Sequence, residues 1–374
     1  MRLALTPEQE MLRDSVRGFL TAKVGTGLVR RLMETDAGFD EALWAEMAQQ
    51  GWQAMAIPEE HGGAGFTMFE LGVLMEEMGR ALTPAPFLSS VVLGANAFLL
   101  AGSEEQRAEH LPAIAAGEER VALAVQEPAA RWSAAEVTMT ARGHGTGVVL
   151  DGEKSYVLDG HTAHTLLVAA RNAAGGVDLF VVPADAAGVS AMRLETLDMT
   201  RKQAAVTFDG VQVAATARLG EPGAGGRALG PLLDLAVTAL AFEQVGGAER
   251  CMEMSVGYAK DRIQFGRPIG SFQAIKHMCA DMLVEVEAAR SAAYYAGWAA
   301  ATGDADFEVA APLAKARCST AYLSVAAETI QVHGGIGFTW EHDAHLYFKR
   351  AKTDELLFGD PATWRAELAG RIGL

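Results

Sequence analysis

Cysteines are few in this sequence, and long apolar runs are absent from it. The three cysteines, Cys251, Cys279 and Cys318, lie far apart and lack the close pairing of disulfide frameworks and zinc sites. No stretch approaches the roughly 18 uninterrupted apolar residues of a membrane-spanning helix, and the first residues do not read as a signal peptide. We therefore expect reduced thiols, a cytoplasmic location, no bound metal and no membrane partner.

Basic residues are also outnumbered, with 31 Lys and Arg against 47 Asp and Glu and a net charge of -16. This acidic balance repels phosphate backbones, so we expect no nucleic acid partner. Aromatic residues make up only 7% of the chain, whereas hydrophobic residues make up 50% and 40 residues are glycine. The composition indicates a soluble globular protein of two or three domains with closely packed helices.

Hydrophobic spacing divides the 374 residues into three predicted domains. Residues 1–118 have helical spacing, with a capping sequence at Thr6 and a further helical stretch at 87–101. Residues 119–221 contain short alternating apolar runs between DG and GG turns, which predicts an antiparallel β domain. Residues 222–374 are predicted to form a second helical domain.

Three glycine-containing segments interrupt the helical pattern, and the last two are the most informative. GEPGAGGRALG at 220–230 is expected to be a loop that precedes a helix after Pro231. YAKDRIQFGRPIGSFQAIKH at 258–277 predicts a helix end, a break and a helix start, where Arg262 could bind a diphosphate. QVHGGIGF at 331–338 would let backbone approach a ligand closely. The alternatives are an ordinary salt bridge for the arginine and a C-cap turn for the glycines.

The last two segments, together with PEEHGGAG at 58–65 and LMEEMGRAL at 74–82, resemble the acyl-CoA dehydrogenase family of flavoproteins. The resemblance covers essentially the whole chain. It implies an α+β fold with an N-terminal α-helical domain, a middle antiparallel β-barrel or sandwich domain and a C-terminal four-helix bundle. It also implies FAD as the cofactor, bound between the β domain and the bundle and completed by a neighbouring subunit.

The resemblance assigns the diphosphate and adenine half of FAD to residues from two protomers. One protomer would contribute Arg262, Phe265 and Gln273, and the other would contribute Gln331, Gly334 and Gly335. Such a shared site implies a homo-oligomer, either a dimer or a tetramer, or a heterotetramer with a related chain.

Around the flavin ring the match to the family is partial. Residues 126–128 read Gln-Glu-Pro, with Gln126 in place of the common Thr, and residues 156–160 read Tyr-Val-Leu-Asp-Gly in place of Trp-Ile-Thr-Asn-Gly. Tyr156 is expected to cover the ring. Leu158 cannot donate the side-chain hydrogen bond of the usual Thr, although backbone N–H groups could partly replace it.

The family's usual catalytic carboxylate is missing. Many members have a Glu followed by Gly-Thr at the position where this chain has Phe358. A second family arrangement places the Glu on the first bundle helix, where this chain has Ala236. Removing a proton from a carbon acid needs a positioned carboxylate, so another acid is required.

Glu243 is the leading candidate for this base. It follows Ala236 by about two helical turns on the same face, after a mostly apolar run where an unpartnered carboxylate would be costly to bury. The alternative is a structural ion pair within the helical bundle. Asp360 is the next candidate, whereas Glu127 matches a structural Glu of the family.

The leading hypothesis is FAD-dependent α,β-desaturation of an acyl-CoA thioester, with an electron-transfer flavoprotein or a similar acceptor reoxidising the flavin. The moved carboxylate and Phe358 suggest a bulky, branched or cyclic acyl group. A second hypothesis is a non-catalytic or half-active subunit that completes the FAD site of a heteromeric acyl-CoA dehydrogenase. A third is flavin-dependent oxidation of a non-CoA substrate.

Overall fold

The computed structural model describes residues 4–374, which form two compact units. The first, which we call the helical unit, contains the chain up to Arg31 together with Met68–Thr83 and Val237–Leu374. The second, the sheet unit, contains Leu32–Thr67 and Pro84–Ala236. Each unit is assembled from segments far apart in the sequence, and the division into three consecutive domains stays a prediction.

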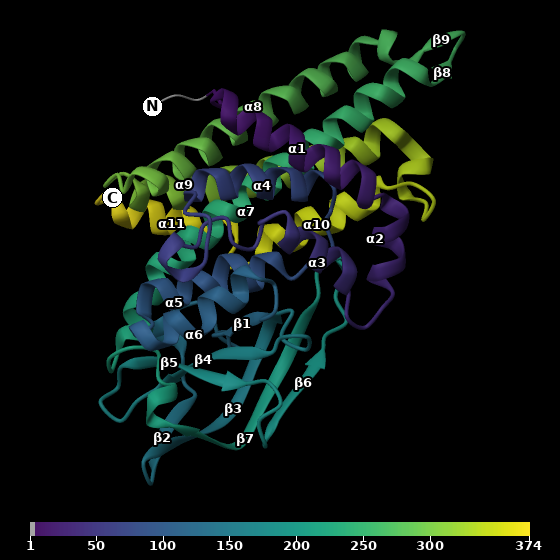
Figure 1. Ribbon diagram of the computed structural model, residues 1–374. Coiled ribbons are helices and arrows are strands. Elements are labelled where there is room, and N and C mark those ends of the chain that lie inside the picture. The colour runs from purple at the N-terminus through teal and green to yellow at the C-terminus, as the bar shows by residue number, and fades with distance from the viewer. Residues whose placement is uncertain (1–3) are drawn as a thin grey trace. The chain divides into compact units, whose positions relative to one another are not determined.

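Long helices build the helical unit. The first is capped as the sequence predicts, because the Thr6 hydroxyl accepts a hydrogen bond from the Gln9 N–H while the Gln9 side chain accepts one from the Thr6 N–H. Helices α8 and α9 run side by side (Figure 1). The helices with all or part of their length in this unit are α1 (Pro7–Lys23), α2 (Thr26–Met33), α4 (Met68–Arg80), α7 (Ala224–Asp261), α8 (Gln273–Thr302), α9 (Phe307–His333), α10 (Ala344–Leu356) and α11 (Pro361–Arg371).

Small residues let α4 and α7 pack closely within the helical unit. A Cβ atom on Gly79 would lie 2.0 Å from the Glu243 carbonyl oxygen, and a Cβ atom on Gly246 would lie 1.7 Å from the Glu76 carbonyl oxygen. The two backbones therefore touch, which only glycine permits. This contact agrees with the close helix packing that the composition indicates.

A seven-stranded sheet and short helices build the sheet unit. The helix expected over 87–101 is interrupted, because Leu88–Ala95 forms a π-helix (η2) before α5 begins. The helices are α3 (Glu41–Gln49), α5 (Asn96–Ala101) and α6 (Glu104–Ala115). The strands are β1 (Val121–Ala124), β2 (Thr140–His144), β3 (Gly147–Leu158), β4 (Thr165–Arg171), β5 (Val177–Pro183), β6 (Val189–Arg193) and β7 (Gln203–Ala214).

The sheet is mixed, whereas the sequence predicts an antiparallel β domain. Most neighbours pair antiparallel, including β2 with β3, β3 with β7 and β4 with β5. Strand β1 instead pairs with β4 in parallel, from Val121 opposite Thr165 to Ala124 opposite Val168. A parallel pair needs a long connection, which β2 and β3 supply. Alternating hydrophobicity identifies strands but does not reveal the direction of a distant partner.

Helix α7 begins at Ala224, so the expectation of a loop throughout 220–230 is wrong. A Cβ atom on Gly225 would lie 2.4 Å from the backbone nitrogen of Leu179 in β5. The missing side chain lets the first turn of the helix lie directly against the strand. This tertiary contact outweighs the low helix propensity of glycine.

Among residues 4–374, α7 is the helix that is long and apolar enough to cross a membrane by length and composition alone. Of its most apolar window, 78% is buried inside the protein. That degree of burial is typical of a core helix.

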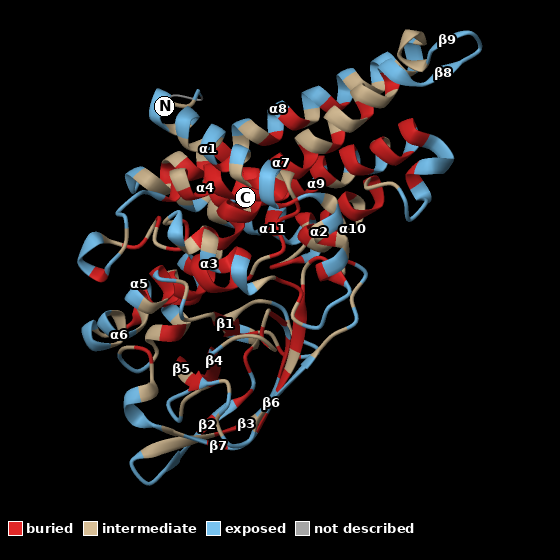
Figure 2. Cartoon of the chain, turned by 45° about the vertical axis from the view of Figure 1, so that its right-hand side comes forward, coloured by how far each residue is buried: buried red, intermediate tan, exposed pale blue. Residues whose placement is uncertain are grey.

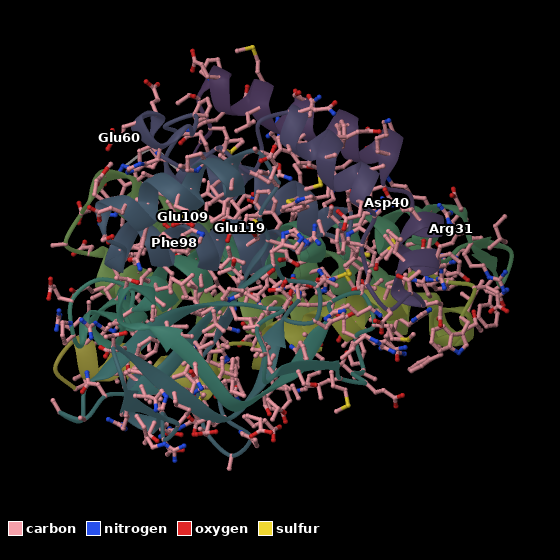
Figure 3. All side chains as sticks on the ribbon, turned by 60° about the horizontal axis from the view of Figure 1, so that its bottom comes forward. Arg31, Asp40, Glu60, Phe98, Glu109 and Glu119 are labelled. Carbon is pink, nitrogen blue, oxygen red and sulfur yellow. The ribbon has the colours of Figure 1, made fainter. Side chains whose placement is uncertain are left out.

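His110 fixes α6 to the sheet. Phe98 and Glu119, both labelled in Figure 3, contact its ring. The Phe98 ring stacks on it at a centroid distance of 4.4 Å, and a Glu119 carboxylate oxygen lies 2.9 Å from Nδ1. Glu119 also accepts a 2.6 Å hydrogen bond from the Thr165 hydroxyl at the start of β4. This polar chain therefore links α6 to β4.

Candidate functional site

An exposed turn follows α7 in the helical unit. Strands β8 (Ile263–Gln264) and β9 (Arg267–Pro268) form a small hairpin whose turn residues, Phe265 and Gly266, have φ angles of 54° and 77°. Positive φ at both positions is typical of a type I′ turn. Figure 2 shows that this hairpin and the adjoining helix ends are largely exposed. Phe265 itself is 91% exposed.

Arg262 lies directly before this hairpin, one residue past the end of α7. No other residue in the described range holds its guanidinium by a hydrogen bond or an ion pair. The salt bridge considered as the alternative for this arginine is therefore not formed within the described chain. Gln273, the first residue of α8, is also exposed. The corner thus presents an available cation beside a helix start, which suits an anionic ligand.

The second glycine segment begins where α9 ends at His333. Gly334 has φ 63° and ψ -140°, and a Cβ atom on Gly334 or on Gly335 would meet no other atom within 4 Å. The Gly334 N–H donates to the Ile330 and Gln331 carbonyl oxygens, so the C-cap turn considered as the alternative is formed. The space beside the two glycines is nevertheless open, so a ligand can approach the backbone closely on this side. Gln331 is exposed one turn earlier. The His333 ring stacks on Tyr258 of α7 at 4.5 Å, so the helical unit brings the two motif segments together.

The residues predicted to face the flavin ring lie in the sheet unit. Tyr156 is 43% exposed and has φ 57°, at a register shift between β3 and β7. A bulky residue in the left-handed region is strained. The Ser155 N–H donates a 2.8 Å hydrogen bond to the Gln126 carbonyl oxygen, so the structure brings these two predicted segments together. The Gln126 side-chain amide donates a 2.9 Å hydrogen bond to the Ala130 carbonyl oxygen.

Leu158 is buried, with 2% of its surface exposed, and its backbone pairs with Gln203 of β7. Its side chain is therefore covered by other residues of the protein. Whatever Leu158 contributes to a ligand must come from its backbone.

These features fit a flavin dinucleotide when each unit is considered by itself. The helical unit offers the Arg262 guanidinium, which pairs with no residue among 4–374, and an uncrowded turn at Gly334 and Gly335, and both suit a diphosphate. The sheet unit offers a strained, exposed aromatic ring at Tyr156. Within the described residues, no group of three or more His, Cys, Asp and Glu side chains could hold a metal ion.

Glu243 lies in the core of the helical unit and is 4% exposed. Its carboxylate accepts a 2.8 Å hydrogen bond from Arg350 of α10, whose side chain is 3% exposed. This is the structural ion pair that the sequence leaves open as the alternative to catalysis. An adjacent guanidinium stabilises a carboxylate in its charged form and makes it a weaker proton acceptor. The assignment of Glu243 as base stays a prediction, and its contact with Arg350 weighs against it.

Arg350 itself is not identified by the sequence pattern. The available signal is indirect, since a glutamate placed in an apolar helix requires a cation from another element. Several arginines could have met that requirement, and only the fold selects the one on α10.

Phe358 occupies the position of the usual family carboxylate. It is 3% exposed, has φ 62°, and its carbonyl oxygen accepts a 3.0 Å hydrogen bond from the Trp364 indole. Lys315 fixes the preceding turn, because its buried ammonium donates to the carbonyl oxygens of Asp354 and Glu355 at the end of α10. The segment is therefore tightly held and presents no acid at this position.

Asp360 caps α11, since its carboxylate accepts a 2.8 Å hydrogen bond from the Thr363 N–H. That backbone hydrogen bond lowers the pKa of Asp360. A carboxylate with a lowered pKa is a weaker base. This second candidate therefore has a structural role as a helix cap, and its lowered pKa weighs against catalysis.

Two substitutions separate the cap from catalysis at Asp360. Asp360→Ala is expected to lower the free energy of unfolding by about 1 kcal/mol, because the N-cap acceptor is lost. Asp360→Asn is expected to keep the stability of the wild type, since Asn caps helices as well as Asp does. Urea unfolding measures both changes. An Asp360→Asn protein that is fully stable but no longer reduces a bound flavin would make Asp360 the base.

The LMEEMGRAL segment forms a network of ion pairs within the helical unit. Arg17 donates to both oxygens of Glu77, at 2.7 and 2.8 Å, and Arg290 pairs with the neighbouring Glu76. Burial raises the pKa of Glu76 to about 7, against the opposing effect of Arg290. Arg80, from the same segment, pairs with glutamates of α7. These charges join α1, α4, α7 and α8, which gives the motif a structural role.

Three family models match the chain in succession. They describe the acyl-CoA dehydrogenase N-terminal domain over residues 6–118, the middle domain over 122–211 and the C-terminal domain over 224–373. The chain belongs to the acyl-CoA dehydrogenase family.

Among the individual proteins that resemble this chain are a mycobacterial dehydrogenase and two proteins of known structure. Acyl-CoA dehydrogenase IpdE2 of Mycobacterium tuberculosis is 36% identical over 361 residues, which cover 96% of this chain and 95% of the relative. The ChsE4–ChsE5 complex of Mycobacterium tuberculosis superposes with a TM-score of 0.91 at 28% identity, covering 100% of this chain and 99% of that one. A variant of the Tcur3481–Tcur3483 steroid ACAD has a TM-score of 0.87 at 34% identity, covering 98% and 97%.

The comparisons confirm the α+β fold class and the enzyme class, an oxidoreductase of the acyl-CoA dehydrogenase family. Members of this family use FAD. The positions of the site residues and the identity of the base stay predictions.

Proposed function

We propose that this chain takes part in the FAD-dependent α,β-desaturation of an acyl-CoA thioester. The observation that carries the proposal is the guanidinium of Arg262, which lies at an exposed turn and pairs with no residue of the described range, in a chain of the acyl-CoA dehydrogenase family. Arg262 would bind the diphosphate of FAD, and the uncrowded turn at Gly334 and Gly335 would let the dinucleotide lie close to the backbone. Tyr156 would cover the flavin ring. When bound, FAD would supply the acceptor for the hydride that leaves the β carbon.

Removal of the α proton requires a carboxylate. Both candidates for this carboxylate in the chain already have a structural role. Glu243 pairs with Arg350, and Asp360 caps α11. Glu243 remains the candidate for a chain that works alone.

A second candidate function follows from these two contacts. The chain would complete the FAD site of a heteromeric acyl-CoA dehydrogenase, and a related partner chain would supply the carboxylate. Phe358 at the usual base position supports this function. So does the likeness to the ChsE4–ChsE5 complex, which contains two unlike chains.

We also propose a bulky, branched or cyclic acyl group as the substrate class. Phe358 is an apolar side chain at the position where many family members have a charge, which favours a larger apolar substrate over a polar one. The similar steroid ACAD supports this direction. An electron-transfer flavoprotein or a similar acceptor would reoxidise the flavin in the cytoplasm.

Flavin reduction tests the proposal. The chain is purified alone and after co-expression with a related chain, and bound flavin and molecular mass are recorded for each sample. Anaerobic titration with a straight-chain and a steroid-side-chain CoA thioester is then followed by flavin bleaching. We expect bleaching by the bulky thioester. Absence of flavin from both samples would overturn the proposal, and bleaching by non-thioester compounds only would favour a different oxidation.

Glu243→Gln locates the base in the same assay. We expect a folded, yellow protein whose bleaching is unchanged if the partner chain supplies the carboxylate. Loss of bleaching with flavin content retained would instead assign the base to Glu243. The matched control is Glu136→Gln, because that glutamate accepts exposed hydrogen bonds from the N–H and the guanidinium of Arg131.

A further inference from the structure

Lys154 is a fully buried lysine in the sheet unit, two residues before Tyr156. Its ammonium donates a 3.1 Å hydrogen bond to the Val125 carbonyl oxygen and pairs with the Glu127 carboxylate at 2.8 Å. A buried lysine is costly unless its charge is compensated, so these two contacts hold the ammonium in a fixed place. Lys154 therefore ties β3 to the segment that contains Gln126.

Glu127 is the centre of this contact. Besides Lys154, it accepts hydrogen bonds from the Thr138 N–H at 3.0 Å, from the Thr138 hydroxyl and from the Met139 N–H at 2.9 Å. Burial alone would raise the pKa of Glu127, but the bonds from Lys154, Thr138 and Met139 outweigh it and lower this pKa to about 2. The carboxylate is thus ionised and held from two separate segments, Lys154 of β3 and residues 138–139.

The backbone next to this ion pair is the strained one. The register between β3 and β7 shifts between Lys154 and Val157, and we call this shifted segment the bulge. Tyr156 lies within it and has φ 57°. The Ser155 N–H reaches the Gln126 carbonyl oxygen at 2.8 Å. Strain of this kind persists only where the surroundings enforce it. The Ser155 hydrogen bond and the contacts of Lys154 fix the residues directly before Tyr156, so they can enforce its conformation.

We propose that the Lys154–Glu127 ion pair is a positioning device that holds Tyr156 and Gln126 in the geometry required to receive the flavin ring. This inference rests on the proposed FAD site and adds two positioning residues to it. Lys154 and Glu127 do not act on the substrate. They keep the bulge in place, so that Tyr156 is exposed before the cofactor arrives.

Lys154→Met tests the device. In the protein without FAD, amide hydrogen exchange over residues 154–158 is expected to accelerate about tenfold or more, because the contacts that hold the bulge are lost. The dissociation constant for FAD is expected to rise about tenfold, as for the loss of a hydrogen bond to a charged group. The double variant Lys154→Met/Glu127→Gln removes both charges and is expected to recover thermal stability. Its fast exchange and weak FAD binding are expected to remain.

Asp178→Asn is the matched control, because Asp178 is a buried acid of the same unit that binds the Gly223 N–H and the Asn172 amide. It is expected to lower stability without changing exchange at 154–158. Unchanged exchange or unchanged FAD affinity in Lys154→Met would overturn the inference. So would full recovery of both in the double variant. If the wild type takes up no FAD, the proposed function fails, while the exchange comparison still tests whether Lys154 holds the bulge.

Discussion

Replacing Arg350 with methionine is expected to lower the free energy of unfolding by about 3–5 kcal/mol, because a buried carboxylate then loses its counter-charge. Glu243 and Arg350 are 4% and 3% exposed, and 2.8 Å separates the paired atoms. Methionine keeps much of the side-chain length and apolar volume, so the loss of charge dominates over the loss of packing. Urea unfolding, monitored by circular dichroism, measures the change.

Two further variants make this result specific. Lys352→Met removes a cation from the same helix, but its partner Glu355 and its own 42% exposure make this a surface pair. We expect it to cost no more than about 1 kcal/mol. The double variant Glu243→Gln/Arg350→Met removes both buried charges and is expected to recover most of the loss. An Arg350→Met protein as stable as Lys352→Met would show that the pair does not support the core.

The sequence predicts the elements of the fold better than their partners. The capping residues at Thr6 and Gln9 act within one turn, so the pattern alone identifies them. The start of α7 at Ala224 depends on a contact between Gly225 and β5 that local propensity cannot reveal. The parallel pairing of β1 with β4 also depends on a contact that is distant in the sequence, because two other strands lie between them along the chain.

The candidate site divides along the same line. Arg262 and Gly334 lie at turns that nearby glycines make predictable from the sequence. In the structure both turns are accessible to a ligand. Arg350 and Lys154 are invisible to the pattern, because each acquires its role from a partner more than twenty residues away. Glu243 has apolar neighbours in the sequence, so its burial and the free-energy cost of that burial can be predicted. The cation that offsets this cost, Arg350, comes from a distant helix and cannot be predicted, so the sequence alone makes Glu243 the leading candidate for the base.

Gly246→Ala is expected to lower the free energy of unfolding by about 3 kcal/mol or more, at the upper end of the range for overpacked cores. The added Cβ would lie 1.7 Å from the Glu76 carbonyl oxygen and 3.0 Å from the Arg80 nitrogen. Both atoms belong to the α4 backbone, so no side chain can turn aside to make room. Helices α4 and α7 must separate, which also disturbs the ion pairs formed by Glu76 and Arg80.

Gly257→Ala provides the matched control in the same helix. A Cβ atom there would meet no other atom within 4 Å, and alanine favours the helix over glycine by up to about 1 kcal/mol. We therefore expect Gly257→Ala to be neutral or slightly stabilising while Gly246→Ala unfolds at much lower urea concentration. Equal midpoints for the two variants would mean that α4 and α7 are not in backbone contact in solution. A selective loss in Gly246→Ala would mean that this contact, and with it the position of Glu243 one turn away, depends on a missing side chain.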